Sequence, residues 1–248
     1  MNVKNLLFAA SAALAVSLQA EVTANNTLCR IEVESAAKSV IVAVPLAQVG
    51  DGKDIKVTDY ILTTNLQKGD SILKWNDKSW DGWTIDDKGA WQAVTSVSGI
   101  GNVSETEPAA DSALARGEAV WLNRSQATIN DSKSFFLYGQ VVAGETTLTA
   151  QAGAFTLLGN PGTTALDLSN VTWKDCADGD NITWNDNDGN RRFVVYHDGK
   201  WCTMSTTVTD GFPTTTFDEL KKDTAVIPVG VGFWYKSTGT TSPSATIK

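Results

Sequence analysis

The sequence predicts an all-β protein with one or two short helices, made of two tandem, internally duplicated units of β-sandwich or barrel type that pack together. Three observations support this fold class. Short apolar segments, some alternating with polar residues, recur throughout a chain rich in Val, Thr, Gly and Trp. Long stretches of helical periodicity are missing from the sequence. Finally, motifs of the first half return in the same order in the second half, as in proteins built from repeats.

The clearest repeated motif is Gly69-Asp70-Ser71-Ile72, which returns about 110 residues later as Gly179-Asp180-Asn181-Ile182. The other matched segments, in chain order, are 41–45 with 157–161, Trp75 with Trp184, 89–91 with 199–201, 117–121 with 230–234, and 127–129 with 245–247. These matches predict a first unit over residues 21–143 and a second unit over residues 144–248. Because matched residues most simply serve a shared scaffold, we expect function at positions that are not matched.

Several strands follow from periodicity alone. Residues 28–34 alternate apolar and polar side chains, which is typical of a strand with one wet face. The continuous apolar segments 40–46 and 155–158 predict buried strands. Residues 135–142 predict a strand that joins the two units, because no Pro-rich or Ser-rich hinge separates them.

Residues 193–204 predict a hairpin, since Asp198-Gly199 between two apolar segments favours a two-residue turn. Residues 99–112 are polar and rich in turn residues, so they predict a surface loop.

Two short helices are expected. One follows Thr58 and places Leu62 and Leu66 roughly on one face. The other begins at Thr216, where the spacing to Glu219 is that of a capping box.

The start of the chain predicts export. Lys4 precedes an apolar, Ala-rich segment over residues 6–18, and small residues follow at Ala20 and Ala24. This layout is typical of a signal peptide over residues 1–20, with cleavage after Ala20 or alternatively after Ala24. The apolar segment is shorter than a membrane span, and no later segment reaches that length. We therefore expect a protein that is secreted, periplasmic or at the cell surface.

Charge narrows the class of partner. The chain carries a net charge of −8 at pH 7 and no cluster of Lys and Arg. Such a surface repels phosphate groups, so we expect no nucleic-acid partner. An extracellular glycan or protein is the expected partner, and the sequence leaves self-association open.

Three cysteines in an exported chain suggest a disulfide. Cys176 and Cys202 both lie in the second unit, at positions where the first unit has Leu66 and Gln92. We predict a Cys176–Cys202 disulfide, which closes a short loop and leaves Cys29 unpaired. The alternative is three separate buried thiols, because connectivity cannot be read from sequence.

Enzyme chemistry finds little support in the sequence. The chain has a single histidine, His197, so any Ser-His-Asp, Cys-His or zinc site must include it. Its place at the predicted hairpin turn is typical of an exposed side chain. Gly-rich phosphate loops and nucleophile elbows are missing from the sequence. A carboxylate pair for glycoside hydrolysis stays open, since two such acids can lie far apart in sequence.

The segment Asp186-Asn187-Asp188-Gly189 resembles part of a calcium loop, which makes Asp186 and Asp188 the candidate ligands of a weak calcium site. The full pattern fails, because Trp184 stands where the first acid belongs and no glutamate follows at the required distance. Asx-rich turns between strands account for the same residues without a metal. We therefore expect no cofactor, with calcium as the alternative.

Six of the nine tryptophans fall in the matched pairs, which favours a role in packing. Trp80, Trp83 and Trp173 have no partner in the other unit. Trp80-Asp81-Gly82-Trp83 predicts an exposed turn flanked by two indoles, on which a sugar ring can stack. The alternative is that these rings cover the barrel ends or the contact between the units, since tryptophan is highly buried on average.

Two segments carry a resemblance to other proteins. Residues 155–161, Phe-Thr-Leu-Leu-Gly-Asn-Pro, and residues 230–235, Gly-Val-Gly-Phe-Trp-Tyr, resemble a recurring pair in uncharacterised secreted bacterial β-rich repeat proteins. In those proteins a "WNLIGNP"-like strand is followed by a "GxGFWY"-like strand. The first unit departs from this pattern at residues 43–45 and 117–121. The resemblance implies an exported β-rich module of surface or extracellular proteins and no assigned activity.

Together these observations predict an exported, non-enzymatic surface or extracellular protein with a structural or adhesive function. The first alternative is a carbohydrate-binding module that uses Trp80, Trp83 and Trp173. The second alternative is a secreted hydrolase.

Overall fold

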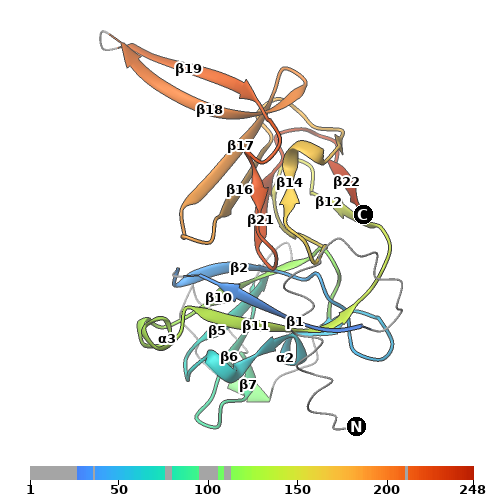
Figure 1. Ribbon diagram of the computed structural model, residues 1–248, viewed down its shortest axis with the longest axis vertical. Helices are drawn as coiled ribbons and strands as arrows, with labels where there is room; N and C mark the ends of the chain where they lie inside the picture. Colours follow the sequence, from blue (N-terminus) through green and yellow to red (C-terminus); the bar gives the residue numbers. More distant parts are fainter. Residues whose placement is uncertain (1–26, 36, 76–79, 95–105, 109–112, 210–211) are drawn as a thin grey trace, which may run out of the picture.

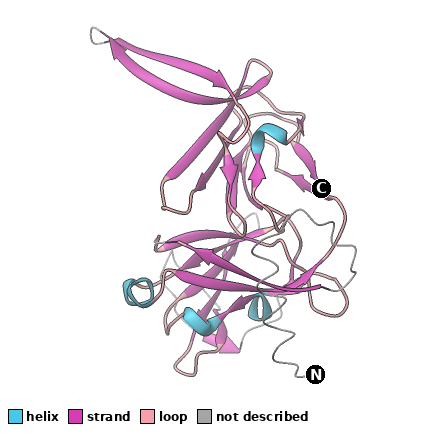
Figure 2. Ribbon diagram, viewed as in Figure 1, coloured by secondary structure: helices cyan, strands magenta, loops and turns pink. Residues whose placement is uncertain are grey.

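The computed structural model describes residues 27–35, 37–75, 80–94, 106–108, 113–209 and 212–248. The predicted signal peptide, both of its cleavage points and most of the predicted loop over residues 99–112 lie outside these ranges. Strands dominate the described residues, and the two α-helices among them are short (Figures 1 and 2), so the predicted all-β class is confirmed. No helix among the described residues has the length and apolar composition of a membrane span.

The first half of the chain forms three antiparallel sheets. Their strand orders are β2-β10-β5-β6-β7-β8, β1-β11-β4 and β3-β9. The strands are β1 (Thr27–Glu34), β2 (Ser39–Ala43), β3 (Ile55–Lys56), β4 (Ile61–Leu62), β5 (Ser71–Trp75), β6 (Trp80–Ile85), β7 (Trp91–Val94), β8 (Thr106–Pro108), β9 (Ala113–Leu114), β10 (Ala119–Asn123) and β11 (Ser134–Val141).

The second half also forms three antiparallel sheets, of six, three and two strands. Their orders are β13-β21-β16-β17-β18-β19, β12-β22-β15 and β14-β20. The strands are β12 (Thr146–Thr149), β13 (Phe155–Gly159), β14 (Leu166–Asp167), β15 (Trp173–Lys174), β16 (Asn181–Asn185), β17 (Arg191–His197), β18 (Lys200–Thr209), β19 (Phe212–Glu219), β20 (Val226–Ile227), β21 (Gly232–Lys236) and β22 (Ser244–Ile247). The strands therefore occupy the sheets in the same order in both halves. Duplication of the chain stays a prediction.

Most of the predicted strands are confirmed. Burial alternates along the second part of β1, as expected for a strand with one wet face. The apolar segments that predict buried strands contain β2 and β13. The predicted hairpin is formed by β17 and β18, and its turn residues Asp198 and Gly199 have φ angles of 49° and 80°. The predicted joining strand is β11, which pairs with β1 and β4 inside the first half.

The two helix predictions need correction. Thr216 lies in the middle of β19, opposite Ser205 of β18, so the helix predicted there is wrong. Cross-strand pairing of Thr-rich segments, which have high strand propensity, outweighs the local capping signal there. The helix expected after Thr58 is reduced to the single turn α2 (Val57–Tyr60), because the next two residues pair with β11 as β4.

The second α-helix of the structure is one that the sequence does not predict. Residues 127–129 lie in α3 (Gln126–Asp131), whose N-cap is Ser125, whereas residues 245–247 lie in β22. The match between these two segments is therefore wrong. The strand of the first half that takes the place of β22 is β11.

Strand register also corrects the match between Trp75 and Trp184. Trp121 of β10 lies opposite Leu73 of β5, and Trp234 of β21 lies opposite Thr183 of β16. Trp184 therefore corresponds to Lys74, one residue before Trp75. Because side chains alternate between the faces of a strand, this shift of one residue puts the two indoles on opposite faces.

The repeated Gly-Asp motif has a clear structural role. Asp70 and Asp180 are fully buried, and each accepts hydrogen bonds that fix a neighbouring loop. Asp180 accepts from Ala177 N at 3.1 Å, from Thr238 N at 2.6 Å and from the Tyr235 hydroxyl at 2.9 Å. Asp70 accepts in the same way from the backbone N–H of residues 67 and 125. Each aspartate thus links the start of a central strand, β5 or β16, to the segment that follows the neighbouring strand, β10 or β21.

The halves meet through main-chain hydrogen bonds between their six-stranded sheets. Ala43 N donates to Gly230 O at 2.9 Å, and Gly159 N donates to Gly117 O at 2.7 Å. By strand register Ala43 corresponds to Gly159 and Gly230 corresponds to Gly117, so the two bonds are equivalent. We call this contact the seam, and define it by β2 and β10 of the first half and β13 and β21 of the second (Figure 1).

The seam requires glycine at Gly159. A Cβ atom added there would collide with the Glu118 carbonyl oxygen and lie 2.9 Å from Ala43 Cα. Gly159→Ala should therefore lower the free energy of unfolding by about 1–3 kcal/mol, because an extra methyl group is forced into a filled space. Gly162→Ala is the matched control, since its Cβ would meet no atom closer than 3.4 Å. Chemical denaturation measures both, and equal stabilities would contradict the described seam.

The buried aspartate gives a second prediction. Asp180→Asn should lower the free energy of unfolding by about 2–3 kcal/mol, because the amide nitrogen has to face N–H or O–H donors that now bond a carboxylate. Asp188→Asn is the control, because Asp188 is exposed. A thermal or chemical unfolding curve for Asp180→Asn that matches the control would refute this role.

Candidate functional site

The tryptophans predicted as a sugar platform do not form one. Trp80 and Trp83 lie on strand β6 rather than in a turn, and they point to opposite faces of it. Trp83 is only 3% exposed and belongs to the hydrophobic core. Trp80 is half-buried on the other face. The prediction of an exposed pair is wrong because the segment pairs with β5 and β7 on its two sides.

Trp173 is also unsuited to a platform. It lies on the short strand β15 and is 8% exposed. Its ring centroid is 4.7 Å from that of Tyr235 and 6.5 Å from that of Trp201. Trp173 therefore packs in the interior of the second half and presents no exposed ring on which a sugar could stack.

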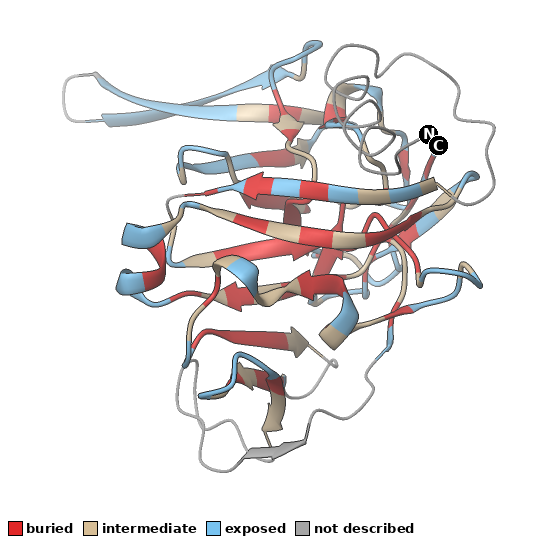
Figure 3. Ribbon diagram, turned by 60° about the horizontal axis from the view of Figure 1, so that its bottom comes forward, coloured by how far each residue is buried: buried red, intermediate tan, exposed pale blue. Residues whose placement is uncertain are grey.

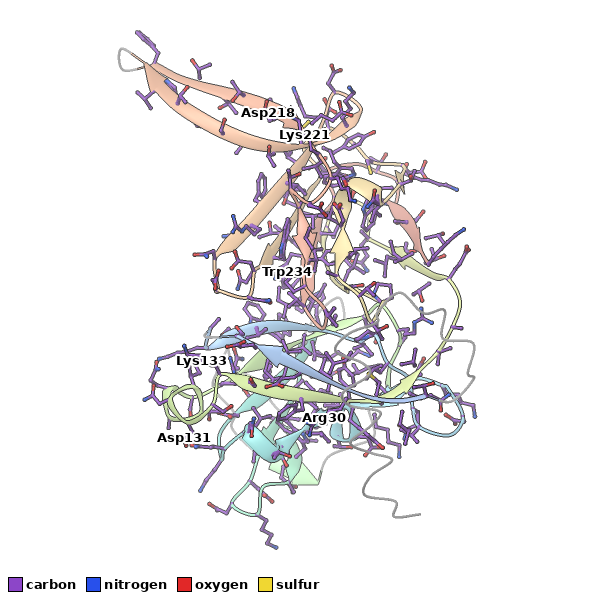
Figure 4. The ribbon with its side chains drawn as sticks, in the orientation of Figure 1. Arg30, Asp131, Lys133, Asp218, Lys221 and Trp234 are labelled. Atoms are coloured by element: carbon purple, nitrogen blue, oxygen red, sulfur yellow. The ribbon has the colours of Figure 1, made fainter. Side chains whose placement is uncertain are left out.

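A different aromatic cluster occupies the seam. The ring centroid of Trp80 lies 5.0 Å from Trp75, 5.8 Å from Trp121 and 6.4 Å from Trp234. Trp121 and Trp234, which belong to different halves, are 6.2 Å apart. The four rings are only partly buried, so tryptophans that were expected to be scaffold contribute to a surface. Figure 4 labels Trp234 on β21, where this strand approaches the first half.

Strand register explains why side chains from the second half join this cluster. Trp234 lies opposite Leu157 and Thr183 on neighbouring strands, and Lys236 lies opposite Phe155 and Asn181. Directly opposed residues share a face of the sheet. The face of the second six-stranded sheet that looks toward the first half therefore carries both aromatic and polar side chains.

A pocket of about 630 Å³ opens at this face. Such a volume is typical of sites for small ligands. Its wall combines five aromatic side chains, three of them from the tryptophan cluster, with polar groups of β16, β17 and β21. The lining residues are Trp75, Trp80, Phe155, Asn181, Thr183, Arg191, Phe193, Trp234 and Lys236. We call this space the seam pocket, because residues of both halves line it.

The charge of the seam pocket differs from that of the chain as a whole. Arg191 and Lys236 are its only charged lining residues among those described, and both are positive. Neither forms an ion pair with a carboxylate among the described residues. The Lys236 ammonium lies 5.5 Å from the centroid of the Phe155 ring, which is a cation–π contact. The pocket thus combines apolar walls with positive charge that no carboxylate of the described residues pairs.

The predicted disulfide is not formed. All three cysteines are free thiols in the structure, so the Cys176–Cys202 prediction is corrected. Cys176 lies 3.5 Å from the hydroxyl of Tyr235, which places its sulfur beside Asp180, whereas Cys202 is buried on β18. Burial raises the pKa of both thiols, and burial together with the Cys176 contact raises the pKa of the Tyr235 hydroxyl.

Asp186 serves a turn rather than a calcium ion. Its Oδ1 accepts from the backbone N–H of Asp188 at 3.1 Å and of Asn190 at 2.8 Å. Its Oδ2 lies 2.7 Å from the Arg192 guanidinium, and these bonds hold the pKa of Asp186 below its usual value despite the opposing effect of desolvation. Donors and a cation already surround this carboxylate, so a calcium ion does not fit there. The described residues contain no group of three or more possible metal ligands.

His197 is an exposed residue at the end of β17, and Cys202 lines the same surface hollow. The ring of His197 stacks on Phe217 of β19 with a centroid distance of 3.9 Å. The exposed neighbours of this stack are Asp198, Lys200 and Glu219, and the last two form an ion pair with each other at 2.7 Å. This arrangement fits a surface packing contact better than the histidine of a hydrolase triad.

The other conspicuous surface is the ribbon of β18 and β19, which projects beyond the rest of the second half (Figures 1 and 3). All described residues of β19 are exposed. Met204 opposite Phe217 and Val208 opposite Pro213 lie on one face of the ribbon, because these positions are four residues apart along each strand. This exposed face carries these four apolar side chains, with the Thr206–Thr215 pair between them.

Comparisons with known proteins add no identification. No protein-family model matches the chain, and no curated protein or solved structure is significantly similar to it.

The free thiols give a direct prediction. Protein denatured without reductant should react with three equivalents of a thiol reagent per chain. In the native state at pH 8 the reaction should be much slower, because a raised pKa keeps the thiols protonated and burial hinders access. If only one thiol reacts and the mass of the chain is lower by two hydrogens, the protein contains a disulfide and the assignment of free thiols is wrong.

Proposed function

We propose that this chain is an exported, non-enzymatic adhesion protein that binds carbohydrate in the seam pocket. Export rests on the signal-like start of the chain, and the resemblance to secreted β-rich repeat proteins agrees with it. The observation that carries the binding function is the pocket wall of Trp75, Trp80, Trp234 and Phe155.

The chemistry of this wall suits a sugar. One face of a sugar ring consists mainly of C–H groups, and such a face packs well on an aromatic ring. Asn181 and Thr183 supply polar groups for hydroxyls at the floor, on strand β16. A few polar groups in a mostly apolar cavity are the usual composition of a ligand site. The pocket is also open to solvent between two sheets, so a polymer can enter it from outside.

The binding test compares two exposed aromatic residues. Phe155 is 56% exposed and lines the pocket, whereas Phe212 is 76% exposed at the tip of the ribbon. Phe155→Ala should weaken glycan binding about tenfold, the loss expected from roughly 1.4 kcal/mol of contact energy. Phe212→Ala should leave binding unchanged. A glycan array followed by titration calorimetry measures both.

Trp80→Ala is the stronger variant of the same test. It removes the ring at the centre of the cluster and should abolish detectable binding. Because Trp80 also packs against its neighbours, its folded state is checked by circular dichroism before binding is measured. A folded Trp80→Ala protein that binds as the wild type does would exclude the seam pocket as the site.

A structural surface protein is the second candidate, and the uncovered apolar face of the ribbon favours it. Exposed apolar ribbons are typical sites of protein association. Val208→Ser removes one of its most exposed apolar side chains at 69% exposure. If the protein assembles through the ribbon, light scattering should show association at high concentration that this change reduces. A wild-type protein that stays monomeric would remove this candidate.

A further inference from the structure

We infer that the ligand of the seam pocket is an acidic oligosaccharide, with carboxylates on more than one ring. The inference rests on the proposed carbohydrate binding and names the charge and size of the ligand. It follows from the charge of the pocket wall and from the separation of the strand positions that carry its two basic residues.

The charge argument begins with the contrast between the pocket and the chain. The chain has 28 acidic residues against 20 basic ones, so an anionic polymer is repelled by most of the surface. In the seam pocket the described charged residues are both basic, and neither is neutralised by a described carboxylate. Local positive charge on an acidic protein selects an anion at that place. A neutral sugar would leave the charges of Arg191 and Lys236 without an anionic partner among the described residues.

The spacing of the two cations sets the size of the ligand. Lys236 on β21 lies opposite Asn181 of β16, whereas Arg191 on β17 lies opposite Asn185, four residues further along β16. One intervening strand places the Cα atoms of these two residues about 10 Å apart across the sheet, and four residues add about 13 Å along the strands. Two cations that start from backbone positions this far apart are best matched by two carboxylates. Carboxylates on separate rings of one chain meet this requirement.

The aromatic rings lie where they can hold the body of such a ligand. Phe155 is paired with Lys236, and Phe193 is paired with Thr183 between the two cations. Trp75 and Trp80 face these side chains from the first half and complete the wall. The pocket thus offers apolar surface between two positive ends. A chain of acidic sugars has the same order of groups, with ring faces between carboxylates.

The test uses pairs of ligands in which methylation of the carboxylate removes its charge. Tetrasaccharides of galacturonate, mannuronate and glucuronate are each titrated beside their methyl esters. At least one of the three acidic tetrasaccharides should bind. Its methyl ester should bind at least about tenfold more weakly, and the corresponding monosaccharide should also bind more weakly than the tetrasaccharide. Raising the salt concentration should weaken binding of the acid and leave that of the ester unchanged.

Charge-removing variants locate the effect. Lys236→Gln and Arg191→Gln should each weaken binding of the acid about fivefold and leave binding of the ester unchanged. Lys221→Gln is the control, since Lys221 is an exposed lysine at the far end of the second half from Trp234 (Figure 4). Equal losses for acid and ester in the two variants would overturn the ion pairing.

The outcomes separate this inference from the proposed function. If the esters or neutral tetrasaccharides bind as tightly as the acids, carbohydrate binding stands and the acidic ligand is refuted. If no oligosaccharide binds, the proposed function fails as well. If a fatty acid or an aromatic carboxylate binds in a Phe155-dependent manner and no oligosaccharide does, the pocket binds an anion that is not a sugar.

Discussion

The two halves of the protein approach each other closely enough for backbone hydrogen bonds, and the site depends on this contact. Ala43 N and Gly159 N donate across the seam from equivalent positions of the two six-stranded sheets. A Cβ at Gly232 would lie 2.5 Å from a methyl group of Ile41 and 2.8 Å from Ala119 Cβ, so the sheets are packed as closely as glycine allows. This close approach brings Trp121 and Trp234 together and fixes the distance between the walls of the pocket.

The pocket lies where equivalent positions of the two halves carry different residues. By register, Phe155 takes the place of Ser39, Lys236 that of Asn123, and Arg191 that of Trp80. A symmetrical pair of sheets would form the same surface on both sides of the seam. These differences give one side its aromatic wall and its positive charge, which is why a single face is suited to a ligand.

The fold could be predicted from the sequence to a large extent. Alternation along β1, the apolar segments at β2 and β13 and the Asp-Gly turn before β18 all indicate strands that the structure contains. The capping pattern at Thr216 predicts a helix that the structure does not form. That pattern is local, whereas the strand pairing with β18 depends on residues elsewhere in the chain. Local patterns carry no information on such pairing.

The site could be predicted much less well. Trp80 was recognised, but Trp83 was placed beside it because the segment resembled a turn, and in a strand residues three apart face opposite ways. Trp75 and Trp234 were assigned to the scaffold because they matched other tryptophans. The one-residue shift between Trp75 and Trp184 was visible in the sequence, and counting residues from the shared glycine would have separated the exposed indole from the buried one.

The central claim is that the tryptophans of the seam, and not those of the core, contact the ligand. Two-dimensional NMR of the nine indole N–H groups during titration with an acidic tetrasaccharide tests it most directly. The indole signals of Trp75, Trp80 and Trp234 should shift, while those of the buried Trp83, Trp173 and Trp184 stay in place. Shifts confined to the buried tryptophans, or no shift at saturating ligand, would contradict the account.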